Sequence, residues 1–324
     1  MNDNFTESWQ IGTNCSKLIS HPSKAVTTLQ AIVMIITTLT DIFGNILVIL
    51  SILQNKKLRN PGNIFVISLA VADLMVALHP YPLLVVALLQ KQWTMGMLQC
   101  QLAAIIQGLS FIGSILNITA IAINRYCCIC HSQVYDKLYS MKNTYYLVIW
   151  TWTLSIALVL PMILEGALQY DPRVYSCTFV FTTNLSFTSV LAVLHFIIPL
   201  TTVIYCYTRI WILVIQVKYR VRQENKQKVK ASEVRNFFTM FAAFVLFAVC
   251  WGPYSISALI LSFNPDRKSP IISDELFVVG FFMAYFNSCL NGIAYGIFNP
   301  NFRQQYKNVV LSLCSLIARN LQTF

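Results

Sequence analysis

Charged side chains are scarce in this sequence. Only 11% of its 324 residues are Asp, Glu, Lys or Arg, whereas 56% are hydrophobic. Soluble globular proteins carry about 25% charged residues, so the composition disfavours an ordinary cytosolic enzyme. Disorder is excluded because it requires low hydrophobicity and high charge. The composition therefore predicts a chain that folds as one membrane domain.

Motifs for enzymatic and metal chemistry are also missing. The sequence has no H-E-x-x-H, P-loop or G-x-S-x-G motif and no pair of intramembrane acids spaced for proteolysis. Its four histidines lie on different segments, and its ten cysteines lack short metal-binding spacings. It has no internal repeat and no paired broken helices of the kind that transporters use. We therefore predict no enzyme, no catalytic residue and no metal centre, and keep a transporter or channel as a distant alternative.

Long apolar segments dominate what is present. Crossing a bilayer takes about 20 apolar residues, and seven segments are long enough: approximately 27–53, 63–89, 98–130, 144–165, 187–217, 233–262 and 275–298. The prediction is an all-α membrane protein in which seven transmembrane helices occupy 27–298. Segment 300–314 should form a short amphipathic helix on the inner membrane face, within a cytoplasmic tail 299–324.

Lysine and arginine are unevenly shared between the two sides of these spans. Of the 23, 17 lie on the side that includes the segment after span seven, and 6 lie on the other side. Because positive residues mark the cytoplasmic side, residues 1–26 should be extracellular and the C-terminus cytoplasmic. The net charge of +11 is thereby explained by cytoplasmic loops, and no nucleic-acid partner is needed to account for it. Asn4 and Asn14 in this outer tail stand in glycosylation motifs.

Two cysteines fall on the outer side next to the spans. Cys100 begins span three and Cys177 lies in the loop after span four. Disulfides persist outside the cell, so one between these cysteines would hold the loop over the bundle. Two free thiols are the alternative.

Polar residues inside the spans are functional candidates because charge is costly in a membrane. Asp73 lies in the middle of span two, and Asn45, Asn287 and Asn291 are available as its partners. Such oxygen ligands suit a hard cation such as sodium. A structural hydrogen-bond network between helices is the other interpretation, and the residues leave both open.

Prolines within the spans should kink helices and open a cavity on one side. Trp251, close to Pro253, could sense what fills that cavity, although a packed core tryptophan is the more common case. The prolines are Pro80, Pro82, Pro161, Pro199 and Pro253.

Eight features in this order resemble the rhodopsin-like G-protein-coupled receptors over nearly the whole chain. They are Asn45 after Gly44, Leu69–Asp73, the pair Cys100 and Cys177, Arg125, Trp150, Pro199, Cys250–Pro253 and Asn291–Tyr295. Further segments are similar to melatonin receptors in particular. These are Asn55–Asn60, Ala122–Cys127, Gln169–Arg173, Tyr175–Phe179, Arg209–Leu213 and Met283–Asn291.

The resemblance implies a plasma-membrane receptor for melatonin or a related small indole. It implies coupling to inhibitory heterotrimeric G proteins, lowered cyclic AMP, a role in circadian rhythm and the option of receptor dimers. Asparagine before Arg125 is typical of melatonin receptors, whereas Gly292 stands where they mostly carry alanine. The residues implied in activation are Asn124, Arg125, Tyr126, Pro253, Asn291 and Tyr295.

The ligand pocket is where the chain departs from this family. Residues that match the family pocket are Gly108, Phe179, His195, Trp251 and Tyr285. Met162 and Phe181 replace an asparagine and a glutamine that bind ligand in the family, and neither offers a donor. Other unusual pocket positions are Gln107, Phe111, Tyr254, Ser255 and Phe281.

Two hypotheses about the ligand follow from this pocket. Span three lacks an acid between Gln101 and Asn117, which favours a neutral ligand because a cationic amine would want a carboxylate. The first hypothesis is a melatonin receptor with an altered pocket. The second is a melatonin-related receptor that does not bind melatonin and acts through another ligand or in receptor pairs.

Overall fold

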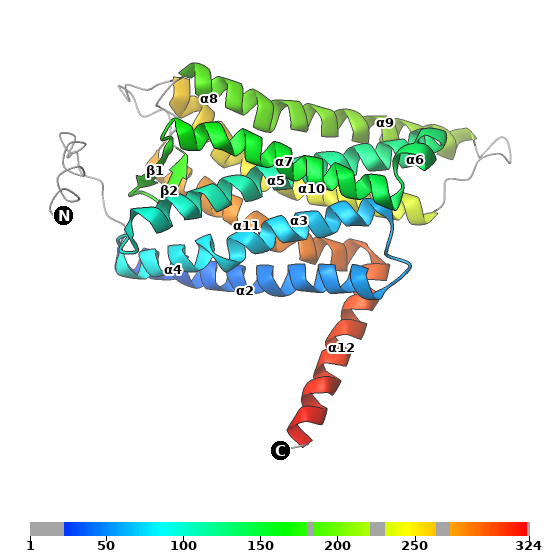
Figure 1. Ribbon diagram of the computed structural model, residues 1–324, viewed down its shortest axis with the longest axis horizontal. Helices are drawn as coiled ribbons and strands as arrows, with labels where there is room; N and C mark the ends of the chain where they lie inside the picture. Colours follow the sequence, from blue (N-terminus) through cyan, green and yellow to red (C-terminus); the bar gives the residue numbers. More distant parts are fainter. Residues whose placement is uncertain (1–22, 180–184, 221–230, 264–272, 323–324) are drawn as a thin grey trace.

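The computed structural model describes residues 23–179, 185–220, 231–263 and 273–322. Within these residues, seven helical segments are long and apolar enough to cross a membrane, and they pack side by side in a bundle (Figure 1). Each overlaps one predicted span. The expected all-α seven-helix membrane fold is therefore confirmed.

Helices account for most of the described chain, with one short hairpin between α7 and α8. The helices are α2 Lys24–Gln54, α3 Pro61–Leu78, α4 Pro80–Gln90, α5 Gly96–Cys130, α6 Ser132–Leu138, α7 Met141–Leu164, α8 Leu185–Ala192, the π-helix η1 Val193–Ile197, α9 Ile198–Arg220, α10 Ala231–Phe263, α11 Asp274–Phe298 and α12 Pro300–Gln322. The strands β1 Leu168–Asp171 and β2 Ser176–Phe179 pair antiparallel, with Leu168 opposite Phe179.

Polar residues set where several of these helices begin. The side chains of Asn60, Ser140 and Ser273 each accept a hydrogen bond from the backbone N–H three residues later, at the first turns of α3, α7 and α11. This satisfies one of the backbone donors that a helix start leaves unpaired. The helix boundaries thus follow from local sequence.

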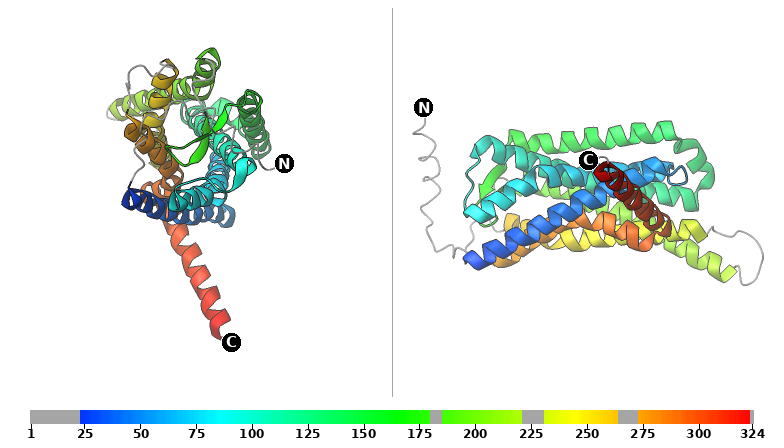
Figure 2. Two further views of the ribbon diagram at one scale, coloured as in Figure 1. Left: turned by 90° about the vertical axis from the view of Figure 1, so that its left-hand side faces the viewer. Right: turned by 90° about the horizontal axis from the view of Figure 1, so that it is seen from below.

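The bundle places α5 at its centre and apolar side chains on its outside. Helix α5 packs against α3, α7 and α9, and α10 packs along α11; the ring of helices is clear in Figure 2. Outward positions such as Leu39, Trp150 and Leu164 are exposed, as a lipid-facing surface requires. The bundle has a hairpin end, which carries β1 and β2, and an Arg125 end, where α12 begins.

The prolines act in different ways. The predicted second span is broken at His79, so that α3 ends before Pro80 and α4 begins with it. Pro199 stands just after the π-helix η1, whereas Pro161 and Pro253 lie inside the continuous helices α7 and α10. Proline cannot donate to the preceding turn, and the chain accommodates this by a break, a wider turn or an uninterrupted helix.

Helix α12 is longer than the expected segment 300–314, since it reaches Gln322. No glycine or proline follows Pro300 in the sequence to stop it. Phe302 and Val309 are buried, whereas Leu311 and Leu313 are exposed. The helix leaves the bundle at an angle at the Arg125 end (Figure 1).

Candidate functional site

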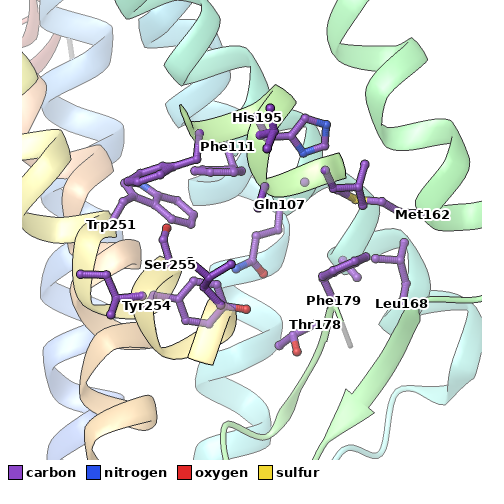
Figure 3. A pocket seen from close by; sticks show the side chains of 18 of the residues that line it. Gln107, Phe111, Met162, Leu168, Thr178, Phe179, His195, Trp251, Tyr254 and Ser255 are labelled. Atoms are coloured by element: carbon purple, nitrogen blue, oxygen red, sulfur yellow. The ribbon is translucent and has the colours of Figure 1, made fainter. Parts of the chain in front are cut away.

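A cavity of about 500 Å³ lies at the hairpin end of the bundle (Figure 3). Helices α5, α7, α8, α10, the π-helix η1 and the hairpin all contribute to its walls. The lining residues used below are Gln107, Gly108, Phe111, Met162, Leu168, Thr178, Phe179, His195, Trp251, Tyr254 and Ser255. A cavity of this size, bounded mainly by apolar groups, is typical of a small-molecule site.

Aromatic rings form the deep wall of the cavity. The ring centroids of Phe111 and Trp251 are 4.2 Å apart, and Phe111 also stacks on Phe247 at 6.3 Å. Trp251 is 9% exposed, and its buried Nε1 has no hydrogen-bond partner among the described residues. The tryptophan therefore presents both a flat ring and an unused donor near the cavity.

The π-helix η1 determines where His195 points. It runs over Val193–Ile197, immediately before Pro199, and π-turns inside helices often accompany functional sites. His195 lines the cavity, and its buried Nε2 has no hydrogen-bond partner in the described part of the chain. The unpaired nitrogen leaves His195 able to hydrogen-bond a ligand in the cavity.

The hairpin covers the cavity and is covalently held. Cys100 at the start of α5 and Cys177 in β2 form the predicted disulfide, with a Cα–Cα distance of 5.2 Å. Phe179 and Thr178 in β2 and Leu168 in β1 consequently lie against the cavity. The disulfide thus ties residues of a loop to the helix that supplies the central wall.

A cluster of charges joins the hairpin to α11. The Arg173 guanidinium lies 2.6 Å from Asp171 Oδ2 and 3.0 Å from Asp274 Oδ1, and its Cζ stands 4.0 Å from the centre of the Phe277 ring. Burial alone would lower the pKa of Arg173, but its hydrogen bonds and ion pairs outweigh this and raise the pKa. The hairpin is thereby fastened on both sides of the cavity.

The cavity lining is neutral. None of the described lining residues is Asp, Glu, Lys or Arg. Most of its hydroxyl and amide groups lie on α5, α10 and β2, at Gln107, Tyr254, Ser255 and Thr178, and Ser189 of α8 adds another; Met162 and Leu168 form an apolar wall opposite (Figure 3). This arrangement suits a neutral, largely aromatic molecule with a few hydrogen-bonding groups.

Most of the predicted ligand residues meet at this cavity. Gly108, Phe179, His195, Trp251 and Met162 line it. Two others differ from the prediction, because Tyr285 and Phe281 are not among the lining residues. Both are buried, with ring centroids 4.5 Å apart, and Tyr285 OH donates to Gln107 Oε1. Tyr285 thus lies behind Gln107, and Phe181 lies outside the described residues.

Several lining residues were not predicted at all. Leu168, Thr178, Ile256 and Leu259 line the cavity, and the first two depend on a hairpin that apolar periodicity does not reveal. The α5 wall was detectable, because its lining residues recur at the i, i+3, i+4 and i+7 positions of one helix face. These are Ala104, Gln107, Gly108 and Phe111.

Below the cavity, buried polar groups of α2, α3, α4 and α11 form an intramembrane cluster. Asn291 Nδ2 donates to Asp73 Oδ2 at 2.7 Å, and Asn45 Nδ2 donates to Asp41 Oδ1 at 2.6 Å. Asp41 is fully buried. The cluster contains side-chain oxygens that accept no hydrogen bond from any described residue: Asp73 Oδ1, Asp41 Oδ2, Asn45 Oδ1 and Asn287 Oδ1.

Tyrosines connect this cluster to the cavity. Tyr81 OH lies 2.8 Å from the Tyr285 carbonyl oxygen and 3.2 Å from Ser288 Oγ. Asn45 Nδ2 donates to the Ser288 carbonyl oxygen at 3.3 Å. Because Tyr285 OH donates to Gln107 Oε1, a polar chain runs from the cavity lining through Tyr285, Tyr81 and Ser288 to Asn45, which is bonded to Asp41.

The Arg125 end holds the residues implied in activation. Arg125 is only 4% exposed, and its Nη2 lies so close to Gly62 that a Cβ there would be 1.7 Å away. Both amide atoms of the buried Asn124 lack a hydrogen-bond partner within the described ranges. Tyr126 OH lies 2.9 Å from His131 Nε2. These side chains form a set at the opposite end of the bundle from the cavity.

Two further activation residues lie on α10 and α11. Pro253 is inside α10, close to Trp251 at the cavity. Tyr295 is buried, its ring stacks on Phe302 of α12 at 5.4 Å, and its hydroxyl has no partner among the residues described. The glycosylation candidates Asn4 and Asn14 lie outside the described residues.

Comparisons with known proteins agree with this architecture. Residues 44–295 match the family described as 7 transmembrane receptor (rhodopsin family). The crystal structure of squid rhodopsin superposes with a TM-score of 0.80 at 22% identity, covering 91% of this chain and 88% of that one. At this identity, the similarity to squid rhodopsin establishes the fold alone.

Two relatives share far more sequence. The melatonin receptor type 1C of Gallus gallus is 56% identical over 302 residues, which are 93% of this chain and 87% of that receptor. The melatonin receptor type 1A of Mus musculus is 53% identical over 294 residues, 91% of this chain and 83% of that receptor. The chain therefore belongs to the rhodopsin family of seven-transmembrane receptors, within the group of melatonin receptors, and is a multi-pass plasma-membrane receptor rather than an enzyme.

Proposed function

We propose that this protein is a receptor for melatonin or a closely related neutral indole that couples to inhibitory heterotrimeric G proteins and lowers cyclic AMP. Identity above 50% with melatonin receptors over most of the chain supports the ligand and the coupling. The observation that carries the ligand class is the neutral cavity, lined by Phe179, Trp251 and His195 with no Asp, Glu, Lys or Arg among the described lining residues.

The proposed mechanism is a population shift between two arrangements of the helices. A ligand that contacts Trp251 can favour an arrangement in which α10 has swung outward about Pro253, because proline leaves that turn without one backbone hydrogen bond. Outward movement would free Arg125 at the other end of the bundle to meet the G protein. A cytoplasmic Arg125 end and an extracellular hairpin end belong to this proposal.

One observation favours a second function, a melatonin-related receptor that does not bind melatonin. Met162, 8% exposed, occupies the cavity wall where melatonin receptors have a hydrogen-bonding asparagine, and it offers no donor. Phe181 is the second such replacement. Two lost neutral hydrogen bonds correspond to roughly 5- to 150-fold weaker binding, so compensation elsewhere in the cavity decides between the two functions.

Binding of radiolabelled melatonin to membranes from cells expressing the chain tests the proposal. Nanomolar binding, with agonist inhibition of cyclic AMP that is lost when inhibitory G proteins are inactivated, is expected. No binding by the native chain, together with binding by a Met162→Asn/Phe181→Gln double variant, would establish the second function. No binding by either one, with both present at the cell surface, would refute a melatonin receptor.

We further propose that the intramembrane cluster binds a sodium ion. The unpaired oxygens of Asp73, Asp41, Asn45 and Asn287 fit a hard monovalent cation, which prefers oxygen ligands. A bound ion would compensate carboxylate charge in the membrane, where unpaired charge is costly. If so, agonist affinity should depend on sodium but not on equimolar N-methylglucamine, and Asp73→Asn should abolish that dependence.

The proposed receptor is also glycosylated, in contact with lipid and able to pair. Asn4 and Asn14 would carry glycans, α12 would lie on membrane lipid through its exposed Leu311 and Leu313, and receptor copies would be able to pair. Glycosidase treatment that fails to change the electrophoretic mobility of the surface receptor would refute the first of these.

A further inference from the structure

We infer that Gln107 is the principal hydrogen-bond donor to the ligand in this cavity and selects neutral aromatic ligands that carry an acceptor oxygen, such as amides and ethers. This inference rests on the proposed function, because it concerns the same cavity. It assigns the polar recognition to α5 rather than to α7, where Met162 stands.

The first support is the way in which Gln107 is held. Tyr285 OH, which does not line the cavity, donates to Gln107 Oε1 and so engages the carbonyl half of the amide. Tyr285 is itself immobilised, since it is 2% exposed and its ring packs 4.8 Å from Tyr81 and 4.5 Å from Phe281. The orientation of the Gln107 amide therefore follows from a buried tyrosine.

The second support is the group that remains. A glutamine amide has two N–H donors on Nε2, and no described residue accepts from Gln107 Nε2, although the residue lines the cavity. With one acceptor position of its oxygen taken by Tyr285, Gln107 offers the cavity chiefly its two N–H donors. A ligand acceptor would be bound there, whereas a ligand ammonium group would find no carboxylate in the described lining.

The third support is the distribution of polarity across the cavity. The Gln107 amide is directed toward the side of Tyr254 and Thr178, and the wall on the other side consists of Met162 and Leu168 (Figure 3). Met162 and Leu168 provide no donor and pack into an apolar cluster that also includes Cys177. A flat ligand would place its apolar edge on that wall and its acceptor at Gln107.

The test compares the native chain with Gln107→Met, which keeps the side-chain length and removes the donor. Gln101→Met, an exposed glutamine on the same helix, is the matched control. Competition binding uses three probes: melatonin, N-acetyltryptamine, which lacks the methoxy group, and 5-methoxytryptamine, which lacks the acetyl group. Gln107→Met should weaken melatonin binding by about 2- to 13-fold, the range for one neutral hydrogen bond, and Gln101→Met should not.

The probes identify the acceptor. An equal loss of affinity for melatonin and N-acetyltryptamine places the acetamide carbonyl at Gln107, and a loss of affinity for melatonin alone places the methoxy oxygen there.

Tyr285→Phe should weaken melatonin binding in the native background and have no further effect in Gln107→Met, because Tyr285 acts as a positioning residue through Gln107.

A variant that gains binding for one probe must be folded, so its loss of melatonin binding cannot be due to misfolding. Gln107→Glu introduces a carboxylate that Tyr285 can still hold, so it should bind melatonin less tightly and 5-methoxytryptamine, a cation at neutral pH, more tightly than the native chain. Equal melatonin affinity in the native chain and Gln107→Met overturns the inference and leaves the melatonin receptor standing. Absence of melatonin binding by the native chain overturns the proposed function, and the inference with it.

Discussion

Helices α2 and α11 approach so closely at Gly44 and Gly292 that a single methyl group should separate them. A Cβ added at Gly292 would lie 2.9 Å from the Gly44 carbonyl carbon and 3.0 Å from both its Cα and its oxygen. Carbon atoms in contact prefer separations of about 3.5–4.0 Å, and backbone atoms cannot turn aside as a side chain can. Gly292→Ala must therefore push one helix away from the other.

Gly113→Ala is a matched control for this change. It is a buried position inside α5, where a Cβ would make ordinary contacts of 3.7 Å with Trp152. Both variants gain the same helix propensity, about 1 kcal/mol, so the difference between them isolates the overpacking. Overpacking costs about 1–3 kcal/mol, and Gly292→Ala should be less stable than Gly113→Ala by that amount.

Thermal unfolding in detergent micelles measures the difference. Cys206, Cys250 and Cys289 are buried and free of disulfides, so a thiol-reactive dye reports when the bundle opens. With an unfolding entropy of about 2.1 cal/mol/K for each of the 324 residues, the expected gap between the two midpoints is roughly 1.5–4.5 °C. Equal midpoints, or a higher one for Gly292→Ala, would show that the two helices are not in the tight contact described here.

Three more changes have defined outcomes. Asp171→Asn should speed ligand dissociation more than Asp274→Asn, because the Asp171 side chain is 13% exposed and the Asp274 side chain 62%. An increase of about 2- to 5-fold in the dissociation rate is expected for partly exposed ion pairs with Arg173. Equal dissociation rates in the two variants would show that the hairpin does not control ligand exit. Gly62→Ala should displace the Arg125 side chain and raise basal G-protein activation, measured by nucleotide exchange; unchanged exchange would mean that this burial does not restrain signalling. Reduction of the disulfide between α5 and β2 should lower ligand affinity with little loss of bundle helicity, as followed by circular dichroism, and retained affinity would contradict its role in holding the cavity wall.

The bundle itself could be predicted from the sequence, because a lipid environment makes apolar length decisive. Each span needed only about 20 apolar residues and suitable flanks, and the boundaries erred by a few residues where caps such as Ser140 were not considered. The Cys100–Cys177 pairing was also predicted, since both residues fall on the same side of the membrane.

Other features depend on tertiary structure and could not be predicted from the sequence. The π-turn at His195 and the break at His79 depend on how the chain accommodates Pro199 and Pro80, and a proline permits several accommodations. Tyr285 was assigned to the ligand by resemblance, but the glutamine at 107 is long enough to stand between it and the cavity. The residue that lines the cavity at this point is therefore Gln107, which the sequence marked only as unusual.

The polar chain from Gln107 through Tyr285, Tyr81 and Ser288 to Asn45 and Asp41 has a thermodynamic consequence. A ligand that moves the Gln107 amide would disturb hydrogen bonds that lead into the cluster, so the proposed cation and the ligand should influence each other's binding. Such coupling is reciprocal: if a cation at Asp73 changes ligand affinity tenfold, about 1.4 kcal/mol, the ligand changes cation affinity by the same factor. The receptor would then respond to the ionic composition around it as well as to the concentration of its ligand.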